Sequence, residues 1–310
     1  MVDTYNYQPV YFTCSNGKDL SSILPSMLIR SKITGNRLVS LPFSDFCEPL
    51  LSSIEESEKI KDAVFNYCNE QNLKFIEFRS SETKFPYETE FFRTDLRHLL
   101  FLNKTEDDLF KSFSENTKRN IKAAGKEGVK ISVDNTSEGI KKFYELQCIT
   151  RRRHGLPPQP YKFFKSIFDN IISKGFGDIL FAYKNVEPVA ALMFFITGEK
   201  VLYKFGASSE SILPKGTNHL LMWEAIKKYN QQGFTQFDFG RTETEHEGLR
   251  RFKLGFGAEE RIIYTTRYEI KTKRFISSDS KTTGFHNKIF SQSPIWLLKL
   301  VGKSFYKHLG

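Results

Sequence analysis

The chain has little cysteine and no long apolar run, and these shortages exclude several classes of protein. Its four cysteines show no Cys-x-x-Cys spacing and no neighbouring histidine that would complete a zinc motif. We therefore expect reduced thiols and no metal site, rather than a disulfide framework. No stretch approaches the roughly 20 apolar residues of a membrane span, and the polar, Tyr-rich segment Met1–Leu20 lacks the pattern of a signal peptide. These features predict a cytoplasmic protein.

Positive charge is present in excess. The 310 residues include 46 Lys and Arg against 36 Asp and Glu, a formal net charge of +10, which predicts an anionic partner. Hydrophobic residues at 39% and charged residues at 26% are ordinary for a globular protein, so a disordered or fibrous chain is excluded. A chain of this length forms one large domain or two of moderate size.

Two blocks of the sequence share one order of elements. The first block predicts strands at Tyr5–Ser15, Ile23–Ile29 and Asn36–Leu41, a helix over Glu55–Gln71 and a strand at Leu73–Arg79. The second block predicts strands at Asp178–Asn185, Pro188–Thr197 and Lys200–Ser208, a helix over Asn218–Gln232 and a strand at Phe234–Phe239. Overlaying the two blocks aligns Ile76 with Phe237 and Glu77 with Asp238.

This repetition predicts the fold class α/β (α+β), with two tandem domains that each have a mixed central sheet flanked by helices. We expect a reduced first domain, a second domain that holds the site, and a basic tail with an amphipathic helix, at residues 1–104, 105–270 and 271–310.

A charged helix is predicted between the two blocks. Glu106–Lys126 begins with acidic residues and ends with basic ones, an order that complements a helix dipole. The basic residues are Lys118, Arg119, Lys122 and Lys126. They form either a solvated surface or a helix that faces a phosphate.

The tail is strongly basic. Residues 271–310 contain eight Lys and Arg and one acidic residue, a net +7. Ser277–Thr283 is typical of a linker, and Pro294–Leu309 predicts a short helix with Trp296 and Phe305 opposite a row of lysines. The lysines are Lys299, Lys303 and Lys307. The helix either contacts an anionic membrane from its inner side or packs against its own domain.

Three segments have the residue types that chemistry needs. The first is an arginine triplet followed by a histidine and a Pro-rich turn, at Arg151, Arg152, Arg153 and His154. Guanidinium groups suit a carboxylate or phosphate, and an imidazole exchanges protons near neutral pH. The alternative is an exposed basic helix end.

The second segment precedes the predicted helix of the second block and contains Lys215, Gly216, Thr217 and Asn218. Backbone N–H groups at a helix start attract anions, and Gly216 allows a phosphate to approach closely. Thr217 or Asn218 is a suitable N-cap in any protein. The glycine pattern matches neither a P-loop nor a dinucleotide-binding fold.

The third segment surrounds Asp238, which follows a strand at the place where open α/β sheets put ligands. Cationic residues follow it at Arg241, Arg250, Arg251 and Lys253. They form either a binding site or a structural network of ion pairs.

Four stretches resemble the FemAB-like branch of the GNAT acyltransferase superfamily. They are Arg119–Val129, Asn218–Ile226, the FDFG strand end at 237–240 and Arg251–Ala258, and the resemblance covers roughly residues 20–270. It implies two tandem GNAT-like domains, an enzyme that forms amides, and acyl-CoA or aminoacyl-tRNA as the donor. It implies an amine acceptor in cell-envelope or polysaccharide biosynthesis. Because the opening strand and helices of the family are missing, either the first domain is reduced or the chain is truncated.

Site residues follow from the same resemblance. Lys253 matches the lysine of the Fem FKxxFG segment, and Pro214–Asn218 occupies the place of the donor pyrophosphate, although the strict GNAT glycine signature is absent. If the third strand parts from its neighbour, N–H groups near Phe205–Ala207 stabilise an oxyanion. Asp238 or His154 accepts the proton of the amine. A non-catalytic module for carbohydrate or lipid, and a nucleic-acid-binding protein, are the alternatives.

Overall fold

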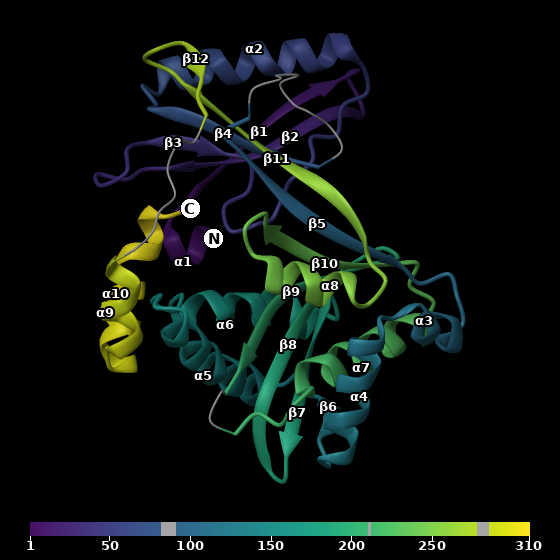
Figure 1. Ribbon diagram of the computed structural model, residues 1–310. Coiled ribbons are helices and arrows are strands. Elements are labelled where there is room, and N and C mark those ends of the chain that lie inside the picture. Colours follow the sequence, from purple (N-terminus) through teal and green to yellow (C-terminus); the bar gives the residue numbers. More distant parts are fainter. Residues whose placement is uncertain (82–90, 210–211, 278–284) are drawn as a thin grey trace. The chain divides into compact units, whose positions relative to one another are not determined.

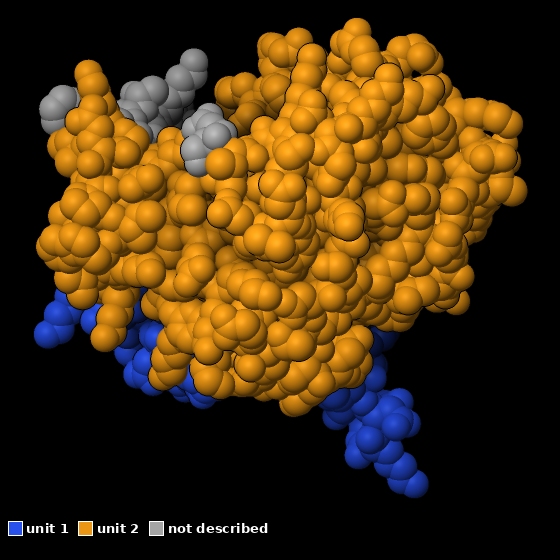
Figure 2. All heavy atoms as spheres, turned by 90° about the horizontal axis from the view of Figure 1, so that it is seen from below, with its two compact units in different colours: residues 1–96, 261–282, 305–310 blue, residues 97–260, 283–304 orange. Residues whose placement is uncertain are grey.

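The structure is a computed structural model that describes residues 1–81, 91–209, 212–277 and 285–310, without the side chains of 285–287 (Figure 1). It divides into two compact units, coloured separately in Figure 2. Unit 1 comprises Met1–Leu96, Arg261–Thr282 and Phe305–Gly310, and unit 2 comprises Arg97–Glu260 and Thr283–Ser304. The domain limits 1–104, 105–270 and 271–310 stay predictions. The division into units differs from them because a late strand, β11 (Glu259–Glu269), pairs with β4 (Phe75–Ser80).

Unit 1 is a sheet with one helix across a face. After the short α1 (Val2–Tyr5), β1 (Gln8–Ser15), β2 (Leu20–Ile29) and β3 (Arg37–Val39) are antiparallel, and β4 joins β3 in parallel. β11 and β12 (Arg274–Phe275) complete the order. Helix α2 (Ile54–Glu70) covers one face (Figure 1), where Ile60, Val64 and Cys68 are buried as their spacing predicts.

Unit 2 has the order β10-β9-β8-β7-β6, antiparallel except for the parallel pair β9 and β10. The strands are β6 (Lys130–Val133), β7 (Gly177–Lys184), β8 (Glu187–Thr197), β9 (Lys200–Ser208) and β10 (Gln236–Glu243). β5 (Arg93–Phe101) has residues in both units. The helices are α3 (Glu106–Ser112), α4 (Glu115–Lys126), α5 (Ser137–Arg153), α6 (Tyr161–Asn170), α7 (Thr217–Gln231) and α8 (Glu247–Leu254), with a 3₁₀ turn η1 (Ile172–Lys174).

The predicted repeat is present in both units. Each has three antiparallel strands, a helix, and a strand parallel to the third. The parallel ladders are equivalent: Val39 lies opposite Glu77 in one, and Leu202 lies opposite Asp238 in the other. The predicted α/β fold class is therefore confirmed, and the aligned acids occupy matching positions.

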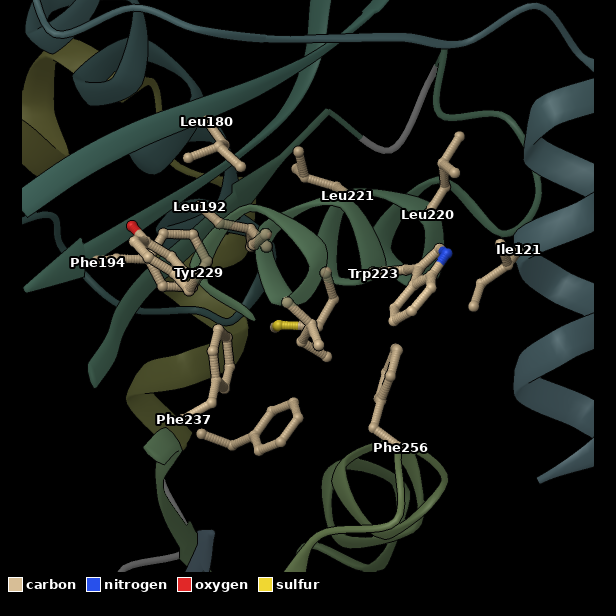
Figure 3. Packing of buried hydrophobic residues seen from close by; sticks show 14 of the residues in the cluster. Ile121, Leu180, Leu192, Phe194, Leu220, Leu221, Trp223, Tyr229, Phe237 and Phe256 are labelled. Carbon is tan, nitrogen blue, oxygen red and sulfur yellow. The ribbon is translucent and has the colours of Figure 1, made fainter. Parts of the chain in front are cut away.

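The single helix predicted over Glu106–Lys126 is wrong. Phe113 is extended (φ −70°, ψ 150°) and ends α3, and the Ser114 hydroxyl accepts the Thr117 N–H to begin α4. The apolar residues nevertheless enter the core. Figure 3 shows Ile121 of α4 and Trp223 of α7 pointing toward one another, with Phe256 below the indole.

The tail is helical in part. Positions 278–283 of the predicted linker lie outside the described residues. Helices α9 (Phe285–Gln292) and α10 (Ile295–Phe305) follow, with a last 3₁₀ turn η2 (Tyr306–His308). Leu298 and Gly302 of α10 are buried, Gly302 against the Pro158 carbonyl, so part of this helix packs on its own unit.

The predicted separation of Trp296 from the lysines is wrong. Trp296, Leu300 and Lys303 are four and three residues apart and share the exposed face of α10. Within the described ranges, every helix is too short or too polar to cross a bilayer.

Candidate active site

The strands β9 and β10 part after a short parallel ladder. Their pairing covers Lys200–Leu202 and Gln236–Asp238, whereas β9 continues to Ser208 and stays paired with β8. Successive N–H groups of a strand alternate between its two edges. The part of β9 beyond Leu202 therefore presents an edge on the side from which β10 has departed, as expected for Phe205–Ala207.

A cavity of about 400 Å³ lies at the start of α7. Its walls come from β8, β9, the loop before α7, α7 itself and α8. The lining residues are Leu192, Tyr203, Leu213, Pro214, Lys215, Gly216, Thr217, Asn218, His219, Met222, Leu249 and Phe252. The four residues predicted to hold the donor are thus brought together in one concave site.

Gly216 is needed here for packing. It is the N-cap of α7 at φ 81°, and a Cβ at this position would lie 2.0 Å from the Asn120 carbonyl oxygen of α4. The expectation that Thr217 or Asn218 caps the helix is wrong, because the Thr217 hydroxyl donates to the Pro214 carbonyl at 2.7 Å and Gly216 supplies no side chain. The start of α7 therefore has no side-chain N-cap from its own capping residue.

His219 is a cavity residue that the sequence interpretation missed. Its half-buried ring lies 4.9 Å from that of Phe252 and 6.0 Å from that of Phe256. Burial lowers the pKa of His219, so the imidazole is neutral at pH 7 and can accept a proton. Its position three residues after Gly216 is the signal that could have identified it.

Helix α8 connects this cavity with the middle of β10, which continues to Glu243, beyond the strand end predicted at Phe239. Leu249 and Phe252 line the cavity, whereas the next residue, Lys253, is buried at 2% exposure. The Lys253 ammonium donates to the carbonyl oxygens of Gly240 at 2.8 Å and Arg241 at 3.0 Å. Lys253 is absent from the cavity lining itself.

The Asp238 carboxylate is also buried, and both of its oxygens accept hydrogen bonds. Its Oδ2 accepts from Arg97 Nε at 2.8 Å, and its Oδ1 accepts from the Gly240 N–H at 2.8 Å. Because both oxygens have donors that favour the carboxylate, this arrangement suits a positioning role better than proton transfer. Arg97 was missed in the sequence interpretation.

A second missed group lies beside Lys253. His98 of β5 is fully buried, and its Nε2 lies 3.2 Å from Glu260 Oε2, which is also held by Arg250 at 2.7 Å. Burial, followed by the nearby Lys253 charge, lowers the pKa of His98 to about 4. The neutral ring donates from Nε2, since a carboxylate only accepts, so Nδ1 faces the Thr242 hydroxyl at 3.5 Å as an acceptor.

Of the arginine triplet, Arg153 reaches the end of β9. Both terminal nitrogens of Arg153 lie 3.3 Å from the Ser208 hydroxyl, and Arg151 donates to the Pro157 carbonyl. Arg152 is half-buried, and His154 is exposed just after α5. Near β10, Arg251 is exposed and Arg241 lies 3.6 Å from Glu243. Among the residues with described positions, no cluster of His, Cys, Asp or Glu could hold a metal ion, and all four cysteines are free thiols.

Comparison with known proteins shows what this part of the chain is similar to. Residues 111–260, from α3 to the start of β11, match the family described as Acetyltransferase (GNAT) domain. Over this segment the chain is similar to a GNAT domain. Its parted β9 and β10 and the cavity before α7 lie within that segment.

Curated relatives of the chain include glycyltransferases. The chain is 22% identical to Lipid II:glycine glycyltransferase of Staphylococcus epidermidis and 22% identical to that of Staphylococcus aureus. Each match covers 60% of this chain and 61% of the relative, so the chain spans about three fifths of their length.

Solved structures share the fold. FemX aligns with a TM-score of 0.64 at 14% identity, over 83% of this chain and 87% of that one. L-PGS from Bacillus licheniformis aligns with a TM-score of 0.56 at 14% identity, over 95% and 89%. A tandem GNAT protein from the clavulanic acid biosynthesis pathway has a TM-score of 0.52 at 8% identity, over 84% and 83%. The resemblance to the FemAB-like branch is confirmed.

Proposed function

We propose that the protein is an N-acyltransferase that forms an amide in cell-envelope biosynthesis. It would move an acyl or aminoacyl group from an anionic carrier, acyl-CoA or aminoacyl-tRNA, to an amine of a cell-wall or sugar precursor. The GNAT match and the glycyltransferase relatives support this proposal. The structural observation that carries it is the cavity at the start of α7 beside the parted edge of β9.

The cavity suits an anionic carrier. The N-terminus of α7 points positive partial charge at it, and Lys215 lines it with a full charge. Leu192, Leu213 and Met222 supply apolar walls against which an acyl chain or a pantetheine arm can lie. Phosphate would therefore be held at the helix start, with the acyl group extending toward β9.

Transfer needs an oxyanion site and a proton acceptor. The carbonyl of the acyl group becomes an oxyanion when the amine attacks, and N–H groups on the edge of β9 near Phe205–Ala207 would stabilise it. The attacking amine loses a proton, and His219 is our preferred acceptor because it lines the cavity in neutral form. Asp238 and His154 remain alternative bases. The arginines at 151–153, 241, 250 and 251 remain candidates for acceptor binding.

Lys253 would act where α8 connects the cavity with the parted strands β9 and β10. Its ammonium binds the carbonyls of Gly240 and Arg241 within β10, so it holds the β10 side of the opening in place. Its buried positive charge would also favour negative charge on the leaving group. Both effects predict that its loss lowers turnover.

The test is a transfer assay with both donor classes. The purified protein is mixed with amine acceptors and either acyl-CoA or aminoacyl-tRNA, and amide products are identified by mass spectrometry. Amide formed with one donor, together with a rise in unfolding temperature caused by that donor alone, would support the proposal and identify the carrier. Lack of product and of thermal stabilisation with both donors would instead favour a non-catalytic binding module.

A further inference from the structure

Unit 1 has a charged cavity that the transfer chemistry does not use. In β4, the side chains of Ile76 and Phe78 pack toward α2, so Glu77 and Arg79 point to the opposite face of the sheet. Across the ladder, Glu77 pairs with Arg267 and Arg79 pairs with Thr265 in β11. A cavity of about 400 Å³ opens on this face.

Cations outnumber acids in the lining of this cavity. The five cationic side chains are Arg37, Lys74, Arg79, Arg93 and Arg267, and the one acidic side chain is Glu77. Glu77 accepts from Arg79 Nε at 2.9 Å and from Arg267 Nε at 3.1 Å. Although burial alone would raise it, these arginines hold the pKa of Glu77 below its usual range, so its charge is already neutralising two guanidinium groups.

The remaining positive charge is crowded. Arg37 donates to the Gly310 oxygen at 2.8 Å and to the His308 carbonyl at 2.8 Å. Burial is the main cause that lowers its pKa, and repulsion from Arg267 and Arg79 adds to the lowering, whereas Glu77 opposes it. Arg93 also lines the cavity, and its Nε is paired with Asp95 Oδ2 at 2.9 Å. An anion with two or more negative charges would relieve this repulsion.

A buried hydroxyl in the same cavity has no partner. Thr265 is 1% exposed, and its Oγ1 makes no hydrogen bond to any residue that the structure describes. Native proteins rarely leave such a group unpaired. Because Thr265 lines the cavity, a bound acceptor oxygen would complete its bonding.

The Arg267 guanidinium is held in place by two aromatic rings. Its guanidinium lies 4.5 Å from the ring centre of Phe75 and 3.6 Å from that of Phe92. A planar group in contact with two rings loses little freedom when it binds an anion.

We propose that this cavity is a binding site for a phosphate ester or pyrophosphate group, with the Thr265 hydroxyl as donor and Lys74, Arg93 and Arg267 as counter-charges. A phosphate matches the excess of cations better than a single carboxylate does, because Glu77 already provides one carboxylate there. The site lies entirely in unit 1 and does not depend on acyl transfer. Its ligand is either a soluble phosphate compound or a phosphate headgroup of a lipid.

Calorimetric titration with inorganic pyrophosphate, and flotation with phosphatidylglycerol vesicles, test the two sources. Thr265→Val removes the hydroxyl at constant shape and should weaken binding roughly fivefold. Lys74→Gln removes an exposed charge and should weaken it roughly tenfold. The matched control is Lys18→Gln, an exposed charge of unit 1 outside the cavity, which should leave binding unchanged.

Saturable pyrophosphate binding that both cavity variants weaken would assign a soluble ligand. Binding confined to vesicles, with the same sensitivity, would assign a lipid headgroup. Absence of binding to both probes, or binding that Thr265→Val and Lys74→Gln leave unchanged, would overturn the proposal. Melting temperatures of the ligand-free variants identify any loss of folding.

Discussion

Asp238 and Lys253 hold the two sides of one residue, Gly240. The carboxylate accepts the Gly240 N–H at 2.8 Å, and the ammonium donates to the Gly240 carbonyl at 2.8 Å. Gly240 has φ 70°, a conformation that other residues rarely adopt. Two buried charges therefore fix the backbone immediately beyond the place where β10 parts from β9.

Replacing Lys253 with Ala should reduce both stability and turnover. The buried Gly240 carbonyl and the partly buried Arg241 carbonyl lose their donor. This loss costs roughly 1–3 kcal/mol, and we expect turnover to fall by at least ~10². Urea unfolding and the transfer assay at a temperature where the variant is folded measure the two effects. Lys130→Ala, an exposed lysine on β6, is the control. Full turnover in folded Lys253→Ala would remove Lys253 from the mechanism.

The pair Arg97 and Asp238 should show strong coupling. Asp238→Asn leaves a buried guanidinium without its counter-charge and should lower the free energy of unfolding by about 3 kcal/mol. Arg97→Gln should cost a similar amount. The double variant should cost clearly less than the sum of both, because no unpaired charge remains. Additive losses in a urea double-mutant cycle would contradict this view of the pair.

Stability should depend on pH through His98. Its pKa is about 4 in the folded protein against an ordinary value of 6.5, so the unfolded chain binds the proton more readily. The stabilisation from neutral His98 is complete above pH 6.5 and is lost as the pH falls toward 4, in total about 3 kcal/mol. Lys253, Arg250 and Glu260 are the charged groups that act on it.

Urea midpoints between pH 4.5 and 7.5 measure this dependence. His98→Gln should flatten the curve in that window. An equally steep curve in the folded variant would show that other groups cause the slope.

The two histidine candidates should separate in kinetics. His219→Gln should lower turnover roughly 10²-fold, as expected for loss of a general base, whereas exposed His154→Gln should leave it nearly unchanged. Because the pKa of His219 is lowered, the acid limb of the pH–rate profile should lie below pH 6.5 and disappear in His219→Gln. The reverse pattern would identify His154 as the base.

Gly216 and Gly233 form a matched pair for testing the start of α7. Both have φ 81°, but a Cβ at Gly216 meets the Asn120 carbonyl, whereas a Cβ at Gly233 meets no atom within 4 Å. Gly233→Ala should cost about 1 kcal/mol from backbone strain alone. Gly216→Ala should cost at least about 2 kcal/mol more, because α4 and α7 must move apart. Equal thermal shifts would show that α4 yields without cost.

Local patterns made much of the fold predictable. β9 has the limits expected from its apolar run, and α2 and α7 agree with their periodicity to within a residue or two. The break between α3 and α4 was not predictable in this way, because Phe113 fits the helical stripe and only Ser114 signals a new start.

The site was predictable only where its residues are close in sequence. Lys215 to Asn218 stand in one motif and line one cavity. Arg97 lies 141 positions before its partner Asp238, and His98 lies 162 positions before Glu260, so no spacing rule connects them. Such pairings arise from strand order, which becomes known only when the sheet is assembled.

The late arrival of β11 has a consequence for synthesis on the ribosome. Until residues 264–269 emerge, the strand at 75–80 has an open edge of unsatisfied N–H and C=O groups. The second unit, whose residues 97–260 are made in between, can acquire its core during that interval. The nascent chain therefore completes unit 1 last. Premature termination before residue 264 would leave a sheet with an open edge that is prone to aggregation.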